Sequence, residues 1–416
     1  MENRVVITGM GAITPIGNSS AEFIANLRAG KVGIERITKI DIENSPVKLA
    51  AEVKDYNPED LGVPKKDIKR MDLFSQYAIS ATVEAMKMSG LDVEKSDSRR
   101  FGVIIGSGIG GMETFESEII KMYEKGGFKI APLFIPMLIG NMAAGNVAKL
   151  LGAKGICTSI VTACATGINC IGEAFRSIKH GYSDVIAAGG TEATITRAAI
   201  AGFSSLRALS TSTNPLCAST PFDKNRNGFV IGEGAGILIL ENYEKAKARK
   251  ANILAEIVGY GTNCDAYHMT APAPDGEGAA RCMTDAMQEA GISPNQIDYI
   301  NAHGTSTPLN DVAETLSIKT AFGEYARKLH ISSSKSMTGH LLGAAGAIEA
   351  IACIGALQGG FIPPTMGYQT PDPECDLNYT PNAAVDNPDI KYTLSNSLGF
   401  GGHNATICIK KWEDES

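Results

Sequence analysis

The sequence has little of what marks a nucleic-acid-binding, membrane or secreted protein. Lysine and arginine total 38 against 45 acidic residues, so the formal charge is −7, without the basic excess of a general nucleic-acid binder. The two uncharged runs that approach membrane length, 130–148 and 155–172, are interrupted by prolines, asparagines or hydroxyl residues. We therefore expect neither to be inserted in a membrane. The first residues predict a strand from about residue 4, which leaves no room for a signal peptide.

The sequence also lacks the cysteine patterns of disulfide frameworks and zinc sites. The nine cysteines are an odd number, and no two of them form a CxxC pair. We therefore expect reduced thiols, a cytoplasmic location and no bound metal.

Strand and helix patterns alternate along the whole chain. Short runs rich in valine and isoleucine, such as RVVITG, FGVIIG and GILILE, are separated by amphipathic helical stretches. This alternation predicts an α/β fold with largely buried sheets. The chain shows a faint internal echo, that is, a weak internal repeat: a polar site precedes a helix both before and after the charged stretch 243–252. The echo suggests two similar halves.

The glycine run GSGIGG at 106–111 formally fits a dinucleotide-binding fingerprint. Such a fingerprint also needs an acidic residue at the end of a following strand, about 20 residues on. Here a helical pattern follows, with no prompt strand. Glycine turns that allow close packing of layers are the better interpretation.

Cys164 lies between a strand-like run and a helix-like run, among residues no larger than threonine. A thiol at a helix N-terminus is exposed to unpaired N–H groups and to the positive end of the helix dipole, and we expect both to lower its pKa. Small neighbours leave room for a substrate carbonyl, and the N–H of Cys164 can stabilise an oxyanion. Cys164 is the candidate nucleophile, and the other eight cysteines are interpreted as structural.

Two of the six histidines stand in settings that favour function. His303 follows the strand run DYINA, and His340 precedes a helix rich in glycine and alanine. Loops at strand ends are where α/β folds carry reacting groups. Cys164, His303 and His340 together suggest thioester chemistry or a cysteine hydrolase, and their spacing does not suit a local zinc motif.

Four segments carry a family resemblance: VTACATGINCIGEA, INAHGTSTPLND, SSSKSMTGHLLGAAGAIEA and LSNSLGFGGHN. They resemble the signature segments of β-ketoacyl-acyl-carrier-protein synthases, most closely the elongating type II members, and the likeness extends over essentially the whole chain. The resemblance implies a thiolase-like fold with two pseudo-repeated halves in a five-layered αβαβα arrangement. We expect the halves at 1–250, with Cys164, and 251–416, with His303 and His340. It also implies a homodimer.

The resemblance further implies a decarboxylative Claisen condensation. An acyl group moves from carrier protein to Cys164, and malonyl-carrier protein then loses carbon dioxide and attacks the acyl-enzyme. His303 and His340 would assist decarboxylation and stabilise the enolate. The product is a 3-oxoacyl-carrier protein of type II fatty acid elongation. The enzyme would need no cofactor of its own, because the carrier protein brings the phosphopantetheine.

Further roles follow from the resemblance for residues around the expected site. Lys335 would pair with Glu314, Phe400 would act as a gate, and Asn310 stands where glycine is more usual. Thr305 and Thr307 would bind the pantetheine arm, and Ile109 and Phe203 would bind substrate.

The expected carrier-protein docking residues are Lys65, Lys66, Lys69, Arg70 and Arg207, although KKDIKR also fits a solvated helix face. Positions where some relatives bind a monovalent cation are Asn301, Glu349, Ser395 and Asn396.

Three alternatives remain open on the sequence. A polyketide ketosynthase of the same fold would use another acyl substrate. A non-catalytic partner would bind carrier protein without turnover. A thiolase would act on coenzyme A substrates, but it would need a second catalytic cysteine.

Overall fold

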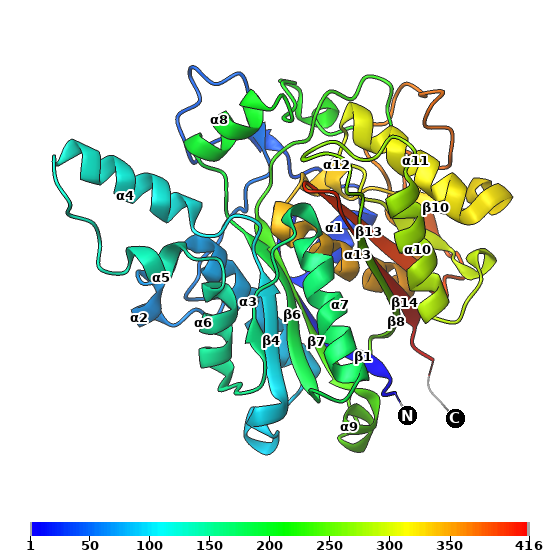
Figure 1. Cartoon of the computed structure of the whole chain (residues 1–416), viewed down its shortest axis with the longest axis horizontal. Coiled ribbons are helices and arrows are strands. Elements are labelled where there is room, and N and C mark those ends of the chain that lie inside the picture. The colour runs from blue at the N-terminus through cyan, green and yellow to red at the C-terminus, as the bar shows by residue number, and fades with distance from the viewer. Residues whose placement is uncertain (1, 414–416) are drawn as a thin grey trace.

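The computed structural model describes residues 2–413, and a ten-stranded sheet runs through them (Figure 1). The sheet consists of two five-stranded parts. The first strand of one part pairs with the first strand of the other, and this pair is the junction between the parts. The first part contains, from the junction outward, β1 (Val5–Ile13), β7 (Gly234–Asn242), β6 (Val185–Glu192), β4 (Phe101–Gly106) and β5 (Cys157–Thr158). The second contains, in the same sense, β8 (Ala255–Cys264), β14 (His403–Lys411), β13 (Tyr392–Gly399), β9 (Tyr299–Asn301) and β10 (His330–Ser332).

The two parts repeat the same strand directions. In each, the junction strand pairs antiparallel with the second strand, and the second pairs antiparallel with the third. The third, fourth and fifth strands are parallel to one another. This repetition agrees with the two similar halves that the sequence suggested from a polar site before a helix in each part.

Helices cover both parts and fill the space between them. Helices α7 (Thr166–Lys179) and α13 (Ala345–Gly359) pack together in the centre, with α1 (Ser20–Arg28) against α13. Helices α3 (Leu73–Ser89) and α6 (Met142–Leu151) contact the first five strands, and α10 (Glu277–Glu289) contacts β8 and β14, with α11 (Pro308–Phe322) against α10. The layers are therefore helix, sheet, helix, sheet, helix, as expected.

The central helices meet through glycine at equivalent places. A short 3₁₀ turn precedes each helix, Ala163–Ala165 before α7 and Leu342–Ala344 before α13. A Cβ at Gly167 would lie 2.7 Å from the backbone N of Ala347, so only glycine allows this approach. Among the described residues, Leu342–Gly359 is the one helix apolar and long enough to cross a membrane, and 89% of it is buried inside the fold.

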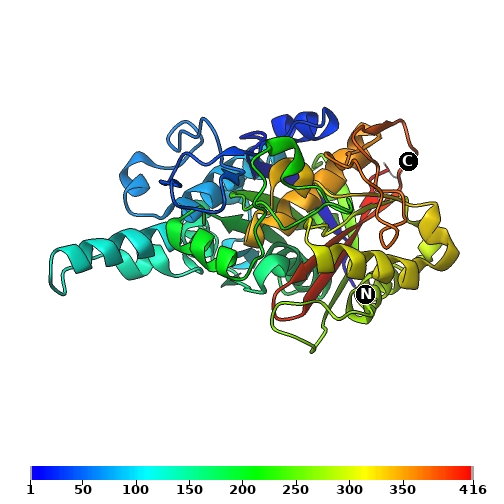
Figure 2. The ribbon, with the colours of Figure 1, turned by 90° about the horizontal axis from the view of Figure 1, so that it is seen from above.

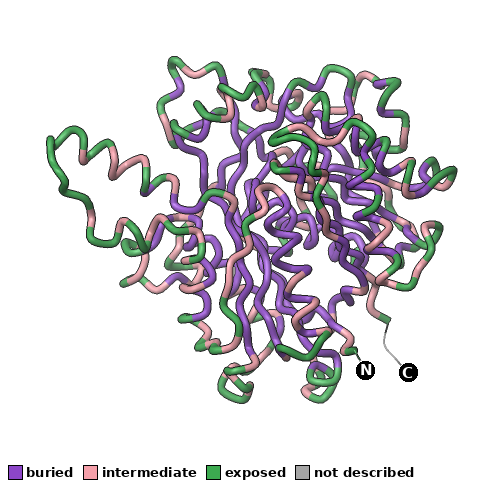
Figure 3. Tube along the Cα trace, viewed as in Figure 1, coloured by how far each residue is buried: buried purple, intermediate pink, exposed green. Residues whose placement is uncertain are grey.

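One part of the molecule projects away from these layers (Figures 1 and 2). This arm consists of α4 (Met112–Glu124) and α5 (Phe134–Leu138), which lie against each other near α6. Only Thr114 is buried in the two helices, and Figure 3 shows the arm as the most exposed part of the chain. The remaining short elements are β2 (Glu35–Arg36), β3 (Leu49–Ala50), α2 (Lys65–Ile68), α8 (Arg197–Ser205), α9 (Tyr243–Ala248), α12 (Lys335–Thr338), β11 (Phe361–Ile362) and β12 (Val385–Asp386).

Candidate active site

Cys164 lies in the 3₁₀ turn that leads into α7, next to a strained residue. Ala163 has a φ of +50°, a conformation that non-glycine residues seldom adopt. Two side chains hold the residue before it, because the Thr166 hydroxyl accepts from the N–H of Thr162 at 2.9 Å and Asn169 Nδ2 donates to Thr162 Oγ1 at 2.6 Å. The turn directs the half-buried Cys164 toward the second half of the chain.

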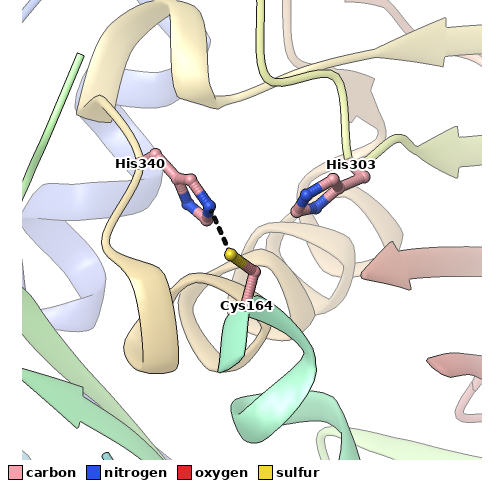
Figure 4. Close-up of side chains that lie close together, drawn as sticks. All are labelled: Cys164, His303 and His340. Carbon is pink, nitrogen blue, oxygen red and sulfur yellow. Dashed lines mark hydrogen bonds between the residues drawn. The ribbon is translucent and has the colours of Figure 1, made fainter. Parts of the chain in front are cut away.

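His340 faces the thiol. Its Nε2 lies 3.0 Å from Cys164 Sγ, and Figure 4 shows both side chains converging on one point. The N–H of Leu342 donates to His340 Nδ1 at 3.3 Å, so Nδ1 is the acceptor and the proton of the neutral ring is on Nε2. His340 therefore presents an N–H donor to the reacting centre.

His303 completes the group from the end of β9. Its ring lies nearly perpendicular to that of His340, with 5.4 Å between the centroids. Lys335 Nζ lies 3.4 Å from His303 Nδ1, and an ammonium is only a donor, so the ring proton is again on Nε2. Burial, and then the charge of Lys335, hold the pKa of both histidines well below the usual value. Both rings are therefore neutral donors at pH 7.

The expected low pKa of Cys164 is wrong for the free enzyme. Burial raises the pKa of this thiol to about 12, although the charge of Lys335 and the N–H of Phe400 act in the opposite direction. The helix dipole acts over the first turn only and does not outweigh this loss of hydration.

The expected pairing of Lys335 with Glu314 is also wrong. The buried Lys335 forms its ion pair with Glu349 of α13. Glu314 instead accepts the N–H groups of His303 and Gly304, both at 2.8 Å. Glu314 thus holds the backbone of His303, and burial raises its pKa to about 7.

A pocket of about 510 Å³ opens onto the three residues. Thr305 and Thr307 line it, with 2.8 Å between their hydroxyl oxygens, and so does Asn310, whose amide donates to Asp311 at 3.1 Å. The other expected residues that line the same pocket are Ile109, Phe203, Arg207, Phe400, Cys164, His303 and His340.

Four of the five expected docking residues lie elsewhere. Lys65, Lys66, Lys69 and Arg70 are exposed on α2 and the turn after it. Lys66 lines a separate, smaller pocket between α2 and α6. Of the five expected docking residues, only Arg207 lines the large pocket.

Known proteins match this chain along its length. The β-ketoacyl synthase N-terminal domain model matches residues 2–246, and the C-terminal domain model matches 254–369. The 3-oxoacyl-[acyl-carrier-protein] synthase 2 of Staphylococcus aureus (strain COL) is 55% identical over 410 residues, 99% of each chain.

The chain belongs to the β-ketoacyl synthase family.

Solved structures of ketosynthases agree. A β-ketoacyl synthase from Burkholderia phymatum STM815 has a TM-score of 0.91 at 37% identity, covering 99% of this chain and 100% of that one. A type II polyketide synthase ketosynthase, solved in complex with its acyl-carrier protein, has a TM-score of 0.88 at 37% identity with the same coverage. The resemblance and the fold class predicted from the sequence are therefore confirmed.

Of the residues expected at a monovalent-cation position, Ser395 and Asn301 are register partners on β13 and β9, and Glu349 forms the ion pair with Lys335. Three buried oxygens there have no hydrogen-bond partner: Asn301 Oδ1, Glu349 Oε2 and Ser395 Oγ. Such oxygens are costly without a partner, and they are the ligand type that alkali cations take. The donor set therefore fits a cation, although Asn396, with Nδ2 3.4 Å from Glu314 and its oxygen accepting from Thr406, has partners of its own.

A metal ion bound by Cys164, His303 and His340 is disfavoured by charge. One ligand atom each of Cys164, His303 and His340 lie within 4.8 Å of one another, as in a metal site. None of these three residues is a carboxylate, so the Lys335 ammonium beside His303 opposes a metal cation at that point, whereas Glu349 offsets the same charge at the buried oxygens.

The sequence analysis missed Glu192. This buried carboxylate ends β6 and accepts the N–H of Gly108 at 2.8 Å, inside the GSGIGG run. A dinucleotide phosphate would need those N–H groups, so the protein's own carboxylate occupies the anion position. An acidic residue two positions after the strand run DVIAAGG was the signal that marked it.

Proposed function

We propose that the chain catalyses the decarboxylative condensation of an acyl group with malonyl-acyl-carrier protein, giving 3-oxoacyl-carrier protein in type II fatty acid elongation. The observation that carries the proposal is the arrangement of one thiol between two neutral imidazoles that both carry their proton on Nε2. Relatives named for this activity, such as that of S. aureus, support it.

In the first half-reaction Cys164 is the nucleophile. Its sulfur attacks the acyl thioester carbonyl, and the tetrahedral oxyanion is stabilised by the N–H groups of Cys164 and Phe400. The intermediate collapses to the acyl-enzyme, and the thiol proton leaves with the pantetheine thiol. The high pKa of the free thiol means that it stays protonated until substrate binds.

In the second half-reaction the two histidines are donors. The bond between the malonyl carboxylate and its α-carbon breaks, carbon dioxide leaves, and the electron pair forms an enolate whose oxygen accepts from both Nε2–H groups. The enolate carbon then attacks the acyl-enzyme carbonyl, and Cys164 leaves as a thiolate, which takes up a proton from water to restore the neutral thiol of the free enzyme. Burial, together with the charge of Lys335, keeps both rings neutral, which is what donation to an oxyanion requires.

The substrates would arrive on an acyl-carrier protein, so no cofactor belongs to the enzyme itself. Thr305 and Thr307, which line the pocket, would bind the pantetheine arm. Arg207 and the basic residues of α2 and the turn after it would dock the acidic carrier protein; these basic residues are Lys65, Lys66, Lys69 and Arg70. The ketosynthase solved with its carrier protein supports this partner, and a cytoplasmic location follows from the proposed pathway.

A second copy of the chain would cover the α4–α5 arm. The arm and the neighbouring edge strand β5 expose large apolar side chains, and patches of this kind mark protein interfaces. Pairing of β5 with its counterpart would also remove an open sheet edge. The exposed residues are Phe115, Ile120, Phe128, Ile130, Leu133, Ile135, Ile139, Ile156 and Val161.

We also propose that the chain divides into halves at 1–250 and 251–416, with the joint after α9, and that a monovalent cation binds Asn301, Glu349 and Ser395. The repeated strand order supports the division. The three unpartnered oxygens support the cation.

The deciding experiment follows the covalent intermediate. The protein is incubated with long-chain acyl-carrier protein, and its intact mass is read before and after malonyl-carrier protein is added. We expect an acyl adduct that disappears as elongated product forms. Cys164→Ala should form no adduct and lose elongation by at least about 10³-fold, as for other covalent nucleophiles. Full elongation by that variant would refute the proposal.

The polyketide alternative rests on structural neighbours of 36–37% identity, against 55% for the fatty-acid-type relative. Successive condensation without reduction, seen as a poly-3-oxo product on the carrier protein, would favour it.

A further inference from the structure

Two segments that serve different parts of the reaction meet behind the pocket. The loop 107–110 after β4 carries Ile109, which lines the pocket. The turn at Leu342 and Gly343 carries the N–H that fixes His340. A Cβ at Gly343 would lie 2.4 Å from the backbone N of Gly108, so the two segments are in direct contact.

Glu192 joins these segments with both carboxylate oxygens. Its Oε1 accepts from the Ser107 hydroxyl at 2.8 Å and from the N–H of Ile109 at 3.4 Å. Its Oε2 accepts from the N–H groups of Gly108 at 2.8 Å and Gly343 at 3.0 Å. All four partners donate, and a carboxylate is the side chain that can accept from four donors at once.

Burial removes the Glu192 carboxylate from water, which disfavours its charged form. Glu192 has no exposed surface, and burial raises its pKa to about 7 in spite of the four donors. A buried carboxylate is disfavoured unless its hydrogen bonds compensate for lost hydration, so the junction depends on these contacts.

We propose that Glu192 is a positioning residue that fixes the pocket wall at Ile109 relative to the His340 turn, and that it thereby sets which acyl chains are transferred to Cys164. This inference rests on the proposed function. Oε2 connects the loop to the turn, whereas Oε1 holds only the loop that bears Ile109. The two oxygens therefore have separable effects.

Glu192→Gln tests this separation. With its amide oxygen in the Oε2 position, glutamine keeps the bonds from Gly108 and Gly343. Its NH₂ group then faces the N–H of Ile109, donor against donor, and changes the bond to Ser107. The wall at Ile109 is altered, whereas the His340 turn is kept. Ser107→Ala removes a donor on the Oε1 side only and should act in the same direction.

The experiment measures two rates for each variant. The first is acyl transfer to Cys164 from short-chain and long-chain acyl-carrier protein, read as intact mass. The second is decarboxylation of malonyl-carrier protein, which depends on the two histidines. In Glu192→Gln the ratio of long-chain to short-chain transfer should change by about tenfold, the factor for one hydrogen bond to a charged group. Decarboxylation should stay within about twofold of wild type, which is little over 0.4 kcal/mol.

Glu84→Gln is the matched control. Glu84 is a carboxylate of α3 that accepts from the N–H of Ala12 and from the N–H and hydroxyl of Ser20, and it does not line the pocket. This variant should leave the transfer ratio unchanged.

Each outcome either supports or overturns the role of Glu192. An unchanged ratio in folded Glu192→Gln overturns the inference, and so does an equal fall in transfer at every chain length together with decarboxylation. If Glu192→Gln does not fold, the ratio in Ser107→Ala decides alone. A wild-type protein that forms no acyl-enzyme refutes the proposed function instead, so the two failures are distinguishable.

Discussion

Nε2 of His340 and Sγ of Cys164 lie 3.0 Å apart, although 176 positions separate them in the chain. The pair does not have the arrangement of a cysteine hydrolase, in which an imidazole accepts the thiol proton and forms a thiolate. Here the N–H of Leu342 occupies Nδ1, so Nε2 already carries a proton. The contact therefore prepares an oxyanion site, and the thiol in the free enzyme is neutral.

The neutral thiol predicts an alkaline pH dependence. Because burial raises the pKa of Cys164 to about 12, alkylation of this thiol by iodoacetamide should still be rising above the ordinary thiol value of 9.0. Intact mass at a series of pH values measures the rate, and Cys164→Ala gives the background from exposed Cys157 and Cys264. A rate that levels off below about pH 8, as for activated cysteines, would contradict the expected high pKa.

The ion pair between Lys335 and Glu349 should show the energetics of buried charge. Lys335→Met leaves the Glu349 carboxylate buried without its partner, which should lower the free energy of unfolding by about 3–5 kcal/mol. Adding Glu349→Leu should recover much of this loss. Urea unfolding measures both, and the exposed pair of Lys65 with Glu59 is the control, because Lys65→Ala should cost at most about 1 kcal/mol. A small effect of Lys335→Met alone would show that the carboxylate is neutralised.

A monovalent cation at Asn301, Glu349 and Ser395 should stabilise the fold. Potassium or sodium chloride should raise the melting temperature above that in choline chloride of equal ionic strength, because the cation binds the native state only. Ser395→Ala should remove this difference. Thr194→Val, which deletes another unpartnered buried hydroxyl, should keep it. Equal melting temperatures in all three salts would exclude the cation.

Ile109 should limit the length of the acyl chain. Ile109→Phe adds volume in the pocket, so transfer of long acyl chains should fall by about tenfold or more, with short chains little affected. Leu316→Phe on α11 is the control, since Leu316 is as exposed as Ile109 (40% and 41%) and does not line the pocket. Equal losses at every chain length would place Ile109 outside the acyl path.

The arm should hold two copies together. Ile135→Glu places a charge in the apolar patch, so light scattering after gel filtration should show a smaller species than wild type. Leu316→Glu, outside the patch, should leave the mass unchanged. A wild-type monomer would refute the proposed homodimer.

Local sequence patterns predicted the three reacting side chains better than the contacts around them. Cys164, His303 and His340 each stand at a strand or helix boundary, where the sequence alone marks a candidate. The ion-pair partner of Lys335 could not be predicted from such local signals. Glu349 lies 14 positions further on, and only the packing of α13 brings it nearer than Glu314. The pKa of Cys164 was mispredicted for the same reason, because a helix start is local whereas burial depends on the whole fold.

The two turns that precede the central helices have an evolutionary consequence. Ala163 and Leu342 share a φ near +50°, and the next residue is Cys164 in one turn and Gly343 in the other. A side chain at 343 would collide with the backbone N of Gly108 at 2.4 Å. If the halves arose by duplication, only one copy could keep a nucleophile once this contact had formed. The other copy would then serve as the scaffold for His340, which faces Cys164 across the two halves.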